Sequence, residues 1–144
     1  LGEGRSGARA VTSAERADRG DRLSRALAPR GVGHGDRVAY LGLNDIATFE
    51  TFFATTRLGA IFVPLNTRLT APEIAFLLTD ARPTVLIHGP EAAEVVRAAE
   101  PAAHGVAAVV PLAGGGPDSF AALVDAGGRP GASRPPAARP EVGL

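Results

Sequence analysis

The chain has 144 residues and a formal net charge of zero, which suggests one domain and no general attraction to nucleic acid or anionic lipid. All 15 residues counted as lysine or arginine are arginines, and cysteine is absent. The sequence therefore excludes Schiff-base and phosphate-loop lysines, disulfides, thiolate catalysis and sulfur-ligated metals within this segment.

Residues 12–30 are predicted to form the first helix. Thr12 and Glu15 have the spacing of a capping box, and Gly31 is expected to end the helix. Apolar residues recur at helical spacing at Leu23, Ala26 and Leu27. Charged residues alternate along the same segment: Arg16, Asp18, Arg19, Asp21, Arg22 and Arg25. We interpret them as a solvated face with local ion pairs, in preference to a stripe that binds nucleic acid.

A short strand at residues 38–41 and a second helix, capped by Asn44 and closed by Gly59, are predicted next. Apolar side chains share one predicted face of this helix, which we expect to be buried: Ile46, Phe49, Phe52, Phe53 and Leu58. Residues 61–63 form a second predicted strand. Because it is uniformly apolar, it should be covered on both faces, and Pro64 suits its end.

Thr70 marks the clearest helix start in the chain, since Pro72 lies in the first turn and Glu73 at capping-box distance. The buried side chains of this helix are expected to be Ile74, Leu77 and Leu78. The remaining predicted elements alternate: a strand at 84–87, a helix at 91–100, a strand at 106–110 and a short helix at 118–125.

Strands that alternate with helices of this length predict parallel βαβ units with right-handed crossovers. The predicted fold class is therefore α/β, an open doubly wound parallel sheet with flanking helices. Residues 1–11 are predicted to be a disordered N-terminal segment and residues 12–126 the α/β subdomain. Residues 127–144, rich in Pro, Gly and Arg, are predicted to be a flexible linker.

None of the candidate motifs predicts a catalytic, cofactor-binding or metal-binding residue. The glycine-rich residues 31–36 follow a helix and open a strand, the reverse of a dinucleotide loop, so we interpret them as a helix cap and turn. The histidines, His34, His88 and His104, lack ligand spacing. His88 ends a predicted strand, where ligands often bind, but a histidine satisfied by its neighbours is favoured. Asp45 and Glu50 are interpreted as capping and solvated residues.

The sequence has no apolar run long enough to span a membrane, and its opening residues do not resemble a signal peptide. A cytoplasmic location is therefore expected. The sequence contains no methionine, even at position 1, which favours a fragment or a processed chain.

Two stretches resemble the first two core motifs of the adenylate-forming acyl-CoA synthetases. Residues 12–27 (TSAERADRGDRLSRAL) lead into residues 30–39 (RGVGHGDRVA), which is similar to the usual helix-to-strand passage of the family. Residues 57–66 (RLGAIFVPLN) resemble the second motif and continue as residues 67–74 (TRLTAPEI). The resemblance covers residues 12–88. It implies the front of the large N-terminal domain of an AMP-binding synthetase.

The resemblance favours the fatty-acyl-CoA ligase branch of the family, but several of the family's functional motifs have no match in this segment. The ending Pro64-Leu65-Asn66 is typical of fatty-acyl-CoA ligases, whereas peptide-synthetase adenylation domains usually place aspartate third. Two departures are Leu43, where proline is common, and Arg16, in place of a usual leucine. The family's Ser/Thr/Gly-rich phosphate loop, ribose-binding aspartate and C-terminal lysine have no match here. The two motifs that are present build scaffold.

The implied reaction converts a carboxylic acid, expected to be a fatty acid, with ATP, Mg²⁺ and CoA into acyl-CoA, AMP and pyrophosphate. The segment alone is expected to be inactive because it lacks the phosphate-stabilising groups. It is also expected to aggregate or to fold marginally. The alternatives are a standalone α/β binding domain without catalysis and a peptide-synthetase adenylation domain.

Overall fold

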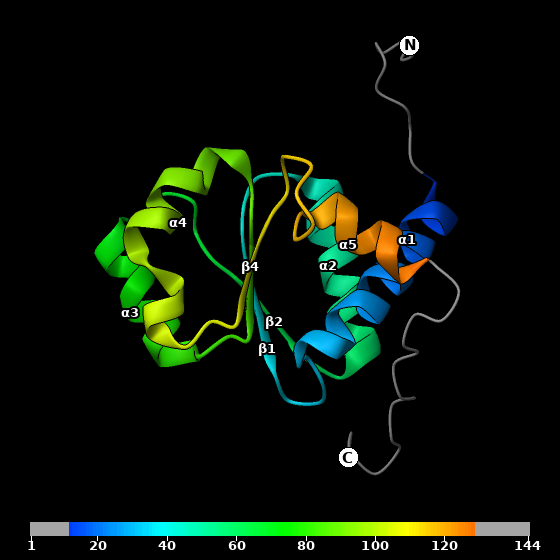
Figure 1. Ribbon diagram of the computed structural model, residues 1–144, viewed down its shortest axis with the longest axis horizontal. Coiled ribbons are helices and arrows are strands. Elements are labelled where there is room, and N and C mark those ends of the chain that lie inside the picture. Colours follow the sequence, from blue (N-terminus) through cyan, green and yellow to red (C-terminus); the bar gives the residue numbers. More distant parts are fainter. Residues whose placement is uncertain (1–11, 129–144) are drawn as a thin grey trace.

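The structure is a computed structural model that describes residues 12–128. A four-stranded parallel sheet lies between two layers of helices, with α1, α2 and α5 on one face and α3 and α4 on the other (Figure 1). The helical segments are α1 (Ser13–Leu27), η1 (Ala28–Arg30), α2 (Asp45–Leu58), α3 (Ala71–Ala81), η2 (Pro90–Ala92), α4 (Ala93–Ala99), η3 (Pro101–His104) and α5 (Phe120–Gly127). The strands are β1 (Arg37–Leu41), β2 (Ile61–Pro64), β3 (Val85–His88) and β4 (Ala108–Pro111). This arrangement confirms the predicted fold class.

The strand order β2-β1-β3-β4 reverses direction once. The chain steps from β1 through α2 to β2, then crosses back over β1 through α3 to reach β3. All three pairings are parallel, with Val38 of β1 opposite Phe62 of β2 and Val85 of β3. The order therefore places a topological switch point between β1 and β3, the two central strands.

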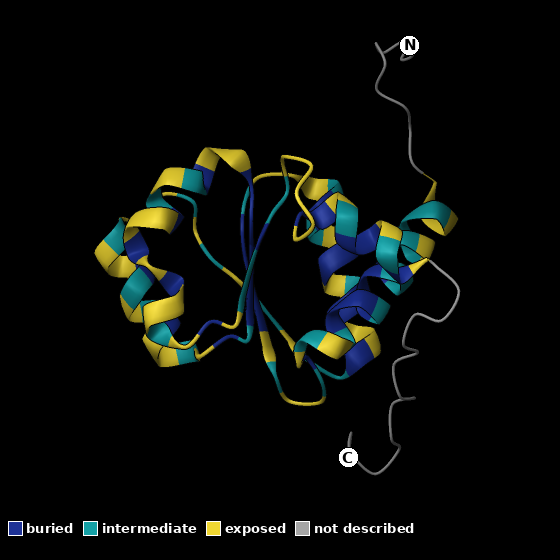
Figure 2. Cartoon of the chain, in the orientation of Figure 1, coloured by how far each residue is buried: buried dark blue, intermediate teal, exposed yellow. Residues whose placement is uncertain are grey.

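Alternate residues of the strands supply the two cores. Val38 and Tyr40 of β1 join the core beneath α1, α2 and α5, whereas Ala39 and Leu41 join the core beneath α3 and α4. This alternation follows from the two-residue period of a strand. Figure 2 shows the result: buried positions concentrate in the sheet and on the inner sides of the helices.

The predicted helix caps are present. Thr12 forms a complete capping box with Glu15, and Thr70 forms one with Glu73. The Asn44 side chain accepts a hydrogen bond of 2.8 Å from the backbone N–H of Ala47. These caps satisfy backbone donors that a helix leaves unpaired in its first turn.

Replacing Thr70 with alanine is expected to lower the free energy of unfolding by about 1 kcal/mol, the usual cost of a lost N-cap. The Thr70 hydroxyl accepts a hydrogen bond of 3.3 Å from the Glu73 N–H, and that bond would be lost. Urea unfolding followed by circular dichroism measures the change. A Thr70→Ser variant keeps the acceptor and should match the parent; an equal loss in both variants would contradict capping as the cause.

The predicted face of α2 is wrong. The buried residues of this helix are Ala47, Glu50, Thr51, Ala54, Thr55 and Leu58. Phe49 is 41% exposed and Phe52 is 53% exposed. Only Leu58 of the predicted stripe is fully buried, because α2 turns its small residues toward α1 and the sheet, where close approach is needed. Phe49 and Phe52 are left on the outer side, whereas Phe53 is half-buried and packs against Gly20 of α1.

The predicted burial of β2 on both faces is also wrong. β2 is the edge strand of the described sheet and pairs only with β1 among residues 12–128. Its end residues Ile61 and Pro64 are exposed, and the two between them are half-buried. In α3, Ile74 and Leu78 are buried as predicted, whereas Leu77 is only half-buried.

The glycine-rich turn and the domain boundary complete the fold. Gly31 caps η1 with a φ of 95°, and the Gly33 N–H donates a 2.7 Å hydrogen bond to Asp36, which confirms a cap and turn. α5 continues to Gly127, one residue past the predicted boundary at 126. The predictions for residues 1–11 and 129–144 lie outside the described residues. None of the helices between residues 12 and 128 combines the length and the hydropathy that a membrane span requires.

Candidate functional site

The carboxyl edge of the sheet, at the switch point between β1 and β3, is the place where open α/β sheets usually bind ligands. The loops after these strands begin with Gly42 and Gly89. The Gly89 N–H donates a 2.9 Å hydrogen bond to the Leu41 carbonyl, which joins the two loops. A Cβ on Gly42 would lie 3.1 Å from the Gly89 nitrogen, so the backbones approach closely here.

The Glu91 carboxylate lies over these two glycines. Its Oε2 accepts a 2.7 Å hydrogen bond from the Leu43 N–H. A Cβ on Gly89 would lie 2.5 Å from the same oxygen, and one on Gly42 would lie 3.3 Å from it. Glycine at both positions therefore makes room for the carboxylate. A side chain of the protein itself therefore lies at the switch point.

The Tyr40 ring lies beside Gly42, at the same switch point. Its hydroxyl donates a 3.1 Å hydrogen bond to the Asn44 carbonyl, which also accepts one of 2.7 Å from the Thr48 hydroxyl. Burial raises the pKa of Tyr40 above its ordinary value near 10, and the Thr48 side chain partly opposes the shift. Carboxylates around the ring raise the pKa further: Glu91, Asp45 and Glu50. The neighbourhood thus disfavours added negative charge.

Tyr40 should make the stability of the protein fall at alkaline pH. Because its pKa is raised on folding, the neutral phenol favours the folded state below pH ~10, and this contribution is lost as pH rises through the folded-state pKa. Tyr40 is the only tyrosine, and lysine and cysteine are absent, so no other side chain titrates in this range. Tyr40→Phe should lower the free energy of unfolding by about 1 kcal/mol at neutral pH, because the hydrogen bond to the Asn44 carbonyl is lost. The free energy of unfolding of this variant should not fall further above pH ~10, because the phenol that titrates there is absent.

Urea unfolding of both proteins at several alkaline pH values measures this effect. The near-ultraviolet absorbance of the phenolate reports the titration of Tyr40 directly in the parent. A Tyr40→Phe variant whose stability falls with pH as steeply as that of the parent would contradict the assignment.

The histidines do not converge on one site. His88, at the end of β3, is 7% exposed, and its Nδ1 lies 2.9 Å from the Gly89 carbonyl, which accepts a hydrogen bond if that nitrogen carries the proton. This contact confirms His88 as a histidine satisfied by its neighbours. His104 Nδ1 lies 2.7 Å from the Thr79 hydroxyl, and His34 lies near Gly59. Among residues 12–128, no group of three or more His, Asp or Glu could hold a metal ion.

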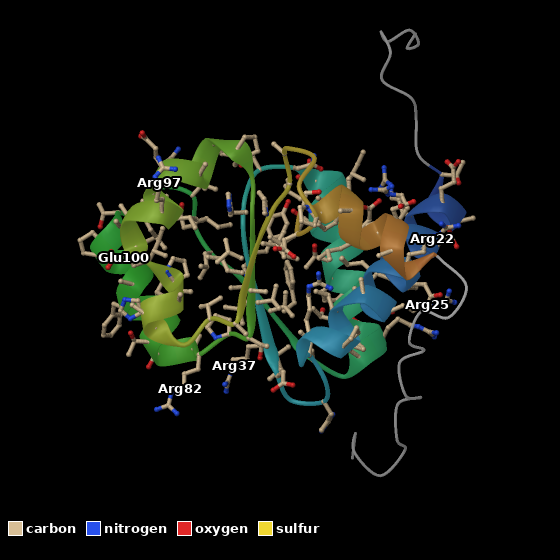
Figure 3. The ribbon with its side chains drawn as sticks, viewed as in Figure 1. Arg22, Arg25, Arg37, Arg82, Arg97 and Glu100 are labelled. Atoms are coloured by element: carbon tan, nitrogen blue, oxygen red, sulfur yellow. The ribbon has the colours of Figure 1, made fainter. Side chains whose placement is uncertain are left out.

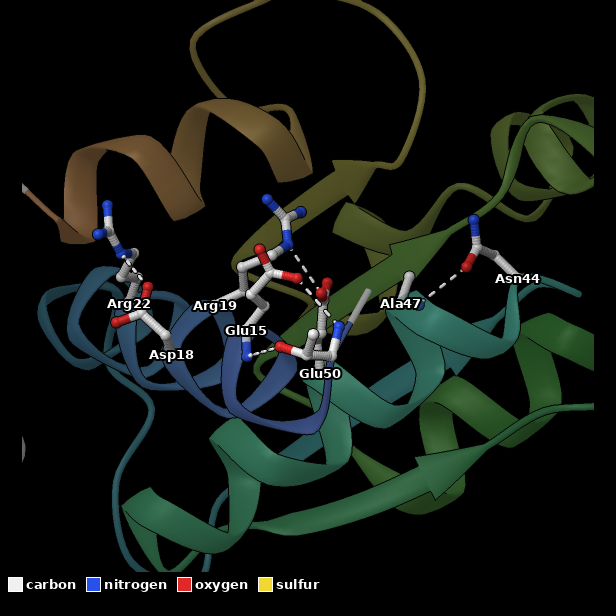
Figure 4. A network of polar contacts seen from close by, with 8 residues as sticks. Glu15, Asp18, Arg19, Arg22, Asn44, Ala47 and Glu50 are labelled. Atoms are coloured by element: carbon white, nitrogen blue, oxygen red, sulfur yellow. Dashed lines mark hydrogen bonds and ion pairs between the residues drawn. The ribbon is translucent and has the colours of Figure 1, made fainter. Parts of the chain in front are cut away.

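Glu50 differs from its predicted solvated role. Its side chain is 1% exposed, and its Oε2 accepts a 2.7 Å hydrogen bond from Nε of Arg19, which is 42% exposed (Figure 4). The same view shows the surface pair between Arg22 and Asp18, at 2.8 Å. The ion pair between Arg19 and Glu50 therefore links α1 to α2. Two buried atoms near these helices, Arg16 Nε and Thr51 Oγ1, have no hydrogen-bond partner within the described residues.

The loops after β1 and β3 do not fit the triphosphate of a nucleotide. Phosphate binding needs free backbone N–H groups or cations, yet the Leu43 N–H is already used by Glu91. The carboxylates around Tyr40 would repel further negative charge. Of the arginines, Arg68 lies in the loop after β2. Arg37 begins β1 and Arg82 caps α3, both at the amino edge, and both point toward solvent (Figure 3).

Comparison with known proteins identifies the family. Residues 5–141 match the family described as AMP-binding enzyme. The chain belongs to this family. A feruloyl-CoA synthase of Amycolatopsis sp. is 52% identical over 94 residues, covering 65% of this chain and 19% of that protein. The long-chain-fatty-acid–CoA ligase FadD13 of Mycobacterium tuberculosis is 41% identical over 78 residues, covering 54% of this chain and 16% of that protein.

A solved structure places the segment within the AMP-binding enzymes. The inhibitor-bound N-terminal domain of FACL13 from Mycobacterium tuberculosis superposes with a TM-score of 0.73 at 33% identity, covering 89% of this chain and 31% of that one. The chain thus spans less than a fifth of each curated relative named above and corresponds to an N-terminal part. These AMP-binding relatives are acyl-CoA ligases, so the chain is an enzyme segment by family, as the sequence motifs predict.

Sequence reasoning did not find Glu91 or the burial of Glu50. The Gly89-Pro90-Glu91 run directly after β3 is a signal that could have indicated a carboxylate near the switch point. The position of Glu50 has no comparable signal, because its burial depends on how α2 is rotated against α1.

Proposed function

We propose that this chain is the N-terminal scaffold of an ATP-dependent acid–CoA ligase. The complete enzyme would join a carboxylic acid to ATP, forming an acyl-adenylate and pyrophosphate, and would then pass the acyl group to the CoA thiol with release of AMP. The observation that carries this proposal is the family match, which runs through residues 5–141. ATP, Mg²⁺ and CoA are the proposed cofactors and co-substrates, and a cytoplasmic location stays a prediction.

The segment alone is proposed to be inactive. Transfer chemistry on phosphates requires donors or cations aimed at the developing charge. This chain has no lysine, and its carboxyl edge holds the Glu91 carboxylate against the Leu43 N–H. The role of residues 12–128 in the reaction would be to support neighbouring parts of the enzyme, which supply the reacting groups.

Two classes of acid are candidates for the substrate. The Pro64-Leu65-Asn66 ending and the likeness to FadD13 support a fatty acid. The higher identity to a feruloyl-CoA synthase supports an aromatic acid as the second candidate. Among residues 12–128, an exposed apolar pocket is lined by Leu69, Pro72, Glu73, Phe76 and Leu77, but it lies on the outer side of α3 and does not distinguish these classes.

ATP–pyrophosphate exchange tests the activity. Residues 1–144 should give no exchange above a control without protein, whether palmitate or ferulate is offered. The protein encoded by the complete reading frame should give exchange with one of these acids and little with the other, which identifies the class. Exchange by residues 1–144 themselves would refute the proposed inactivity.

The coding DNA beyond Leu144 separates this proposal from a non-catalytic binding domain. An open frame that encodes a Ser/Thr/Gly-rich loop with Pro-Lys-Gly supports the ligase. A stop codon at that point would favour the binding domain.

A further inference from the structure

An apolar surface runs from the outer side of α2 to the neighbouring edge strand β2. We call it the aromatic face and define it as Phe49, Phe52 and Phe62. Phe49 is 41% exposed, Phe52 is 53% exposed and Phe62 is half-buried. A phenylalanine can bury about 150–250 Å² in a core or interface, so these side chains leave a large potential stabilisation unused.

Two residues of the aromatic face contact each other across α2 and β2. The rings of Phe52 on α2 and Phe62 on β2 lie 5.8 Å apart, nearly perpendicular at 83°. Phe62 in turn lies 6.1 Å from the buried ring of Tyr40. Phe52 is therefore linked through Phe62 to the core of the sheet.

The free edge of β2 adjoins this face. β2 pairs with β1 on one side, and no other strand among residues 12–128 pairs with its second side. Edge strands of isolated domains usually carry charges or other features that prevent association. Residues 60–65 (AIFVPL) contain no charged or polar side chain. Apart from Pro64, which suits the end of an edge strand, this stretch has the apolar composition of an internal strand.

The remainder of the enzyme is the occupant that the comparisons support. The chain covers 31% of the related N-terminal domain, so more than two thirds of such a domain lies outside this segment. A domain shares one hydrophobic core, which requires its parts to cover each other's apolar surfaces. The outer surfaces of α3 and α4 are largely exposed as well and carry charged residues: Asp80, Glu94 and Arg97. α3 also exposes Phe76, at 69%, but no strand with a free edge in the described sheet adjoins that side chain in the way that β2 adjoins the aromatic face.

We propose that the aromatic face is an internal interface of the complete ligase, covered by an apolar segment from the remainder of the same polypeptide. This proposal rests on the proposed function, because that function supplies the missing part of the chain. It assigns α2 a second role: its inner side packs on α1 and the sheet, and its outer side receives the next part of the domain.

Single-cysteine labelling tests the interface, because this chain has no native cysteine. Phe52→Cys, on the aromatic face, and Glu94→Cys, on the exposed surface of α4, are each made in residues 1–144 and in the protein from the complete reading frame. Each is treated with a thiol reagent, and the modified peptide is followed by mass spectrometry. Cys at 52 should react at least ~10-fold more slowly in the complete protein than in the segment, because reaction there requires local opening.

The Glu94→Cys control and the other possible results distinguish between the partners that could cover the aromatic face. Cys at 94 should react at a similar rate in both proteins. Equal rates at 52 in the two proteins would overturn the proposal. If the labelling rate of Phe52→Cys fell in residues 1–144 as the concentration of that segment rose, a second copy of the segment would be covering the face. That result would also overturn the proposal. ATP–pyrophosphate exchange by the parent complete protein is measured separately, so protection at 52 without exchange would retain the interface and reject the ligase.

Discussion

Replacing Arg19 with methionine is expected to lower the free energy of unfolding by about 3 kcal/mol, because it leaves the Glu50 carboxylate buried without its cation. Glu50 is 1% exposed, and its Oε2 lies 2.7 Å from the Arg19 Nε. Arg19 itself is 42% exposed, so water can partly replace the guanidinium, and we therefore expect the lower end of the range for a broken buried pair. Urea unfolding at neutral pH measures the loss.

The matched control is the same substitution at Arg97. Its partner Glu94 lies 3.7 Å away, and the two side chains are 72% and 92% exposed. Arg97→Met should therefore change the free energy of unfolding by less than about 0.5 kcal/mol. The double variant Arg19→Met with Glu50→Leu should recover most of the loss, because it removes the unpaired charge. Similar losses at Arg19 and Arg97 would contradict a buried pair between α1 and α2.

Gly127→Ala is the second large effect, with an expected loss of about 2–3 kcal/mol, in the upper part of the range for overpacking a core. Gly127 is the last residue of α5, and a Cβ there would overlap the backbone carbonyl oxygen of Arg22 on α1. Neither backbone can give way locally, so α5 would have to move off α1. Urea unfolding measures the loss, and amide hydrogen exchange in α5 should show faster opening.

Gly128→Ala is the matched control for this prediction. The atoms nearest to a Cβ at Gly128 would be the guanidinium and outer stem of Arg22, the far end of a flexible side chain whose ion pair with Asp18 is solvent-exposed. Its cost should therefore be less than about 1 kcal/mol, as for an exposed position. Equal losses at the two glycines would mean that helix propensity or the chain end, not the close approach of α5 to α1, sets the effect.

Both predictions concern the helical layer of α1, α2 and α5. Arg19 fastens α2 to α1 through Glu50, and Gly127 allows α5 to approach α1. The same packing orients α2 so that Phe49 and Phe52 face outward. A variant that loosens this layer should therefore also disturb the proposed interface with the remainder of the ligase.

Local sequence signals determined much of the fold. The capping boxes at Thr12 and Thr70 and the left-handed glycine after α2, Gly59, act within a few residues, so their spacing alone located the helix ends. The alternation of strands and helices was enough to predict a parallel sheet, because parallel strands require crossovers. The two core motifs indicated the family, and the match over residues 5–141 shows it.

The tertiary structure alone decided which side of α2 is buried. The phenylalanines of α2 formed the strongest apolar pattern, yet the helix buries Ala47, Thr51 and Ala54 instead, because close packing against α1 selects small residues. Likewise, Glu50 and Glu91 are ordinary carboxylates in the sequence. Their positions against Arg19 and the Leu43 N–H depend on elements that meet only after the chain has folded. The periodicity of a sequence shows which side of a helix is most apolar. The elements that pack against the helix decide which side is buried.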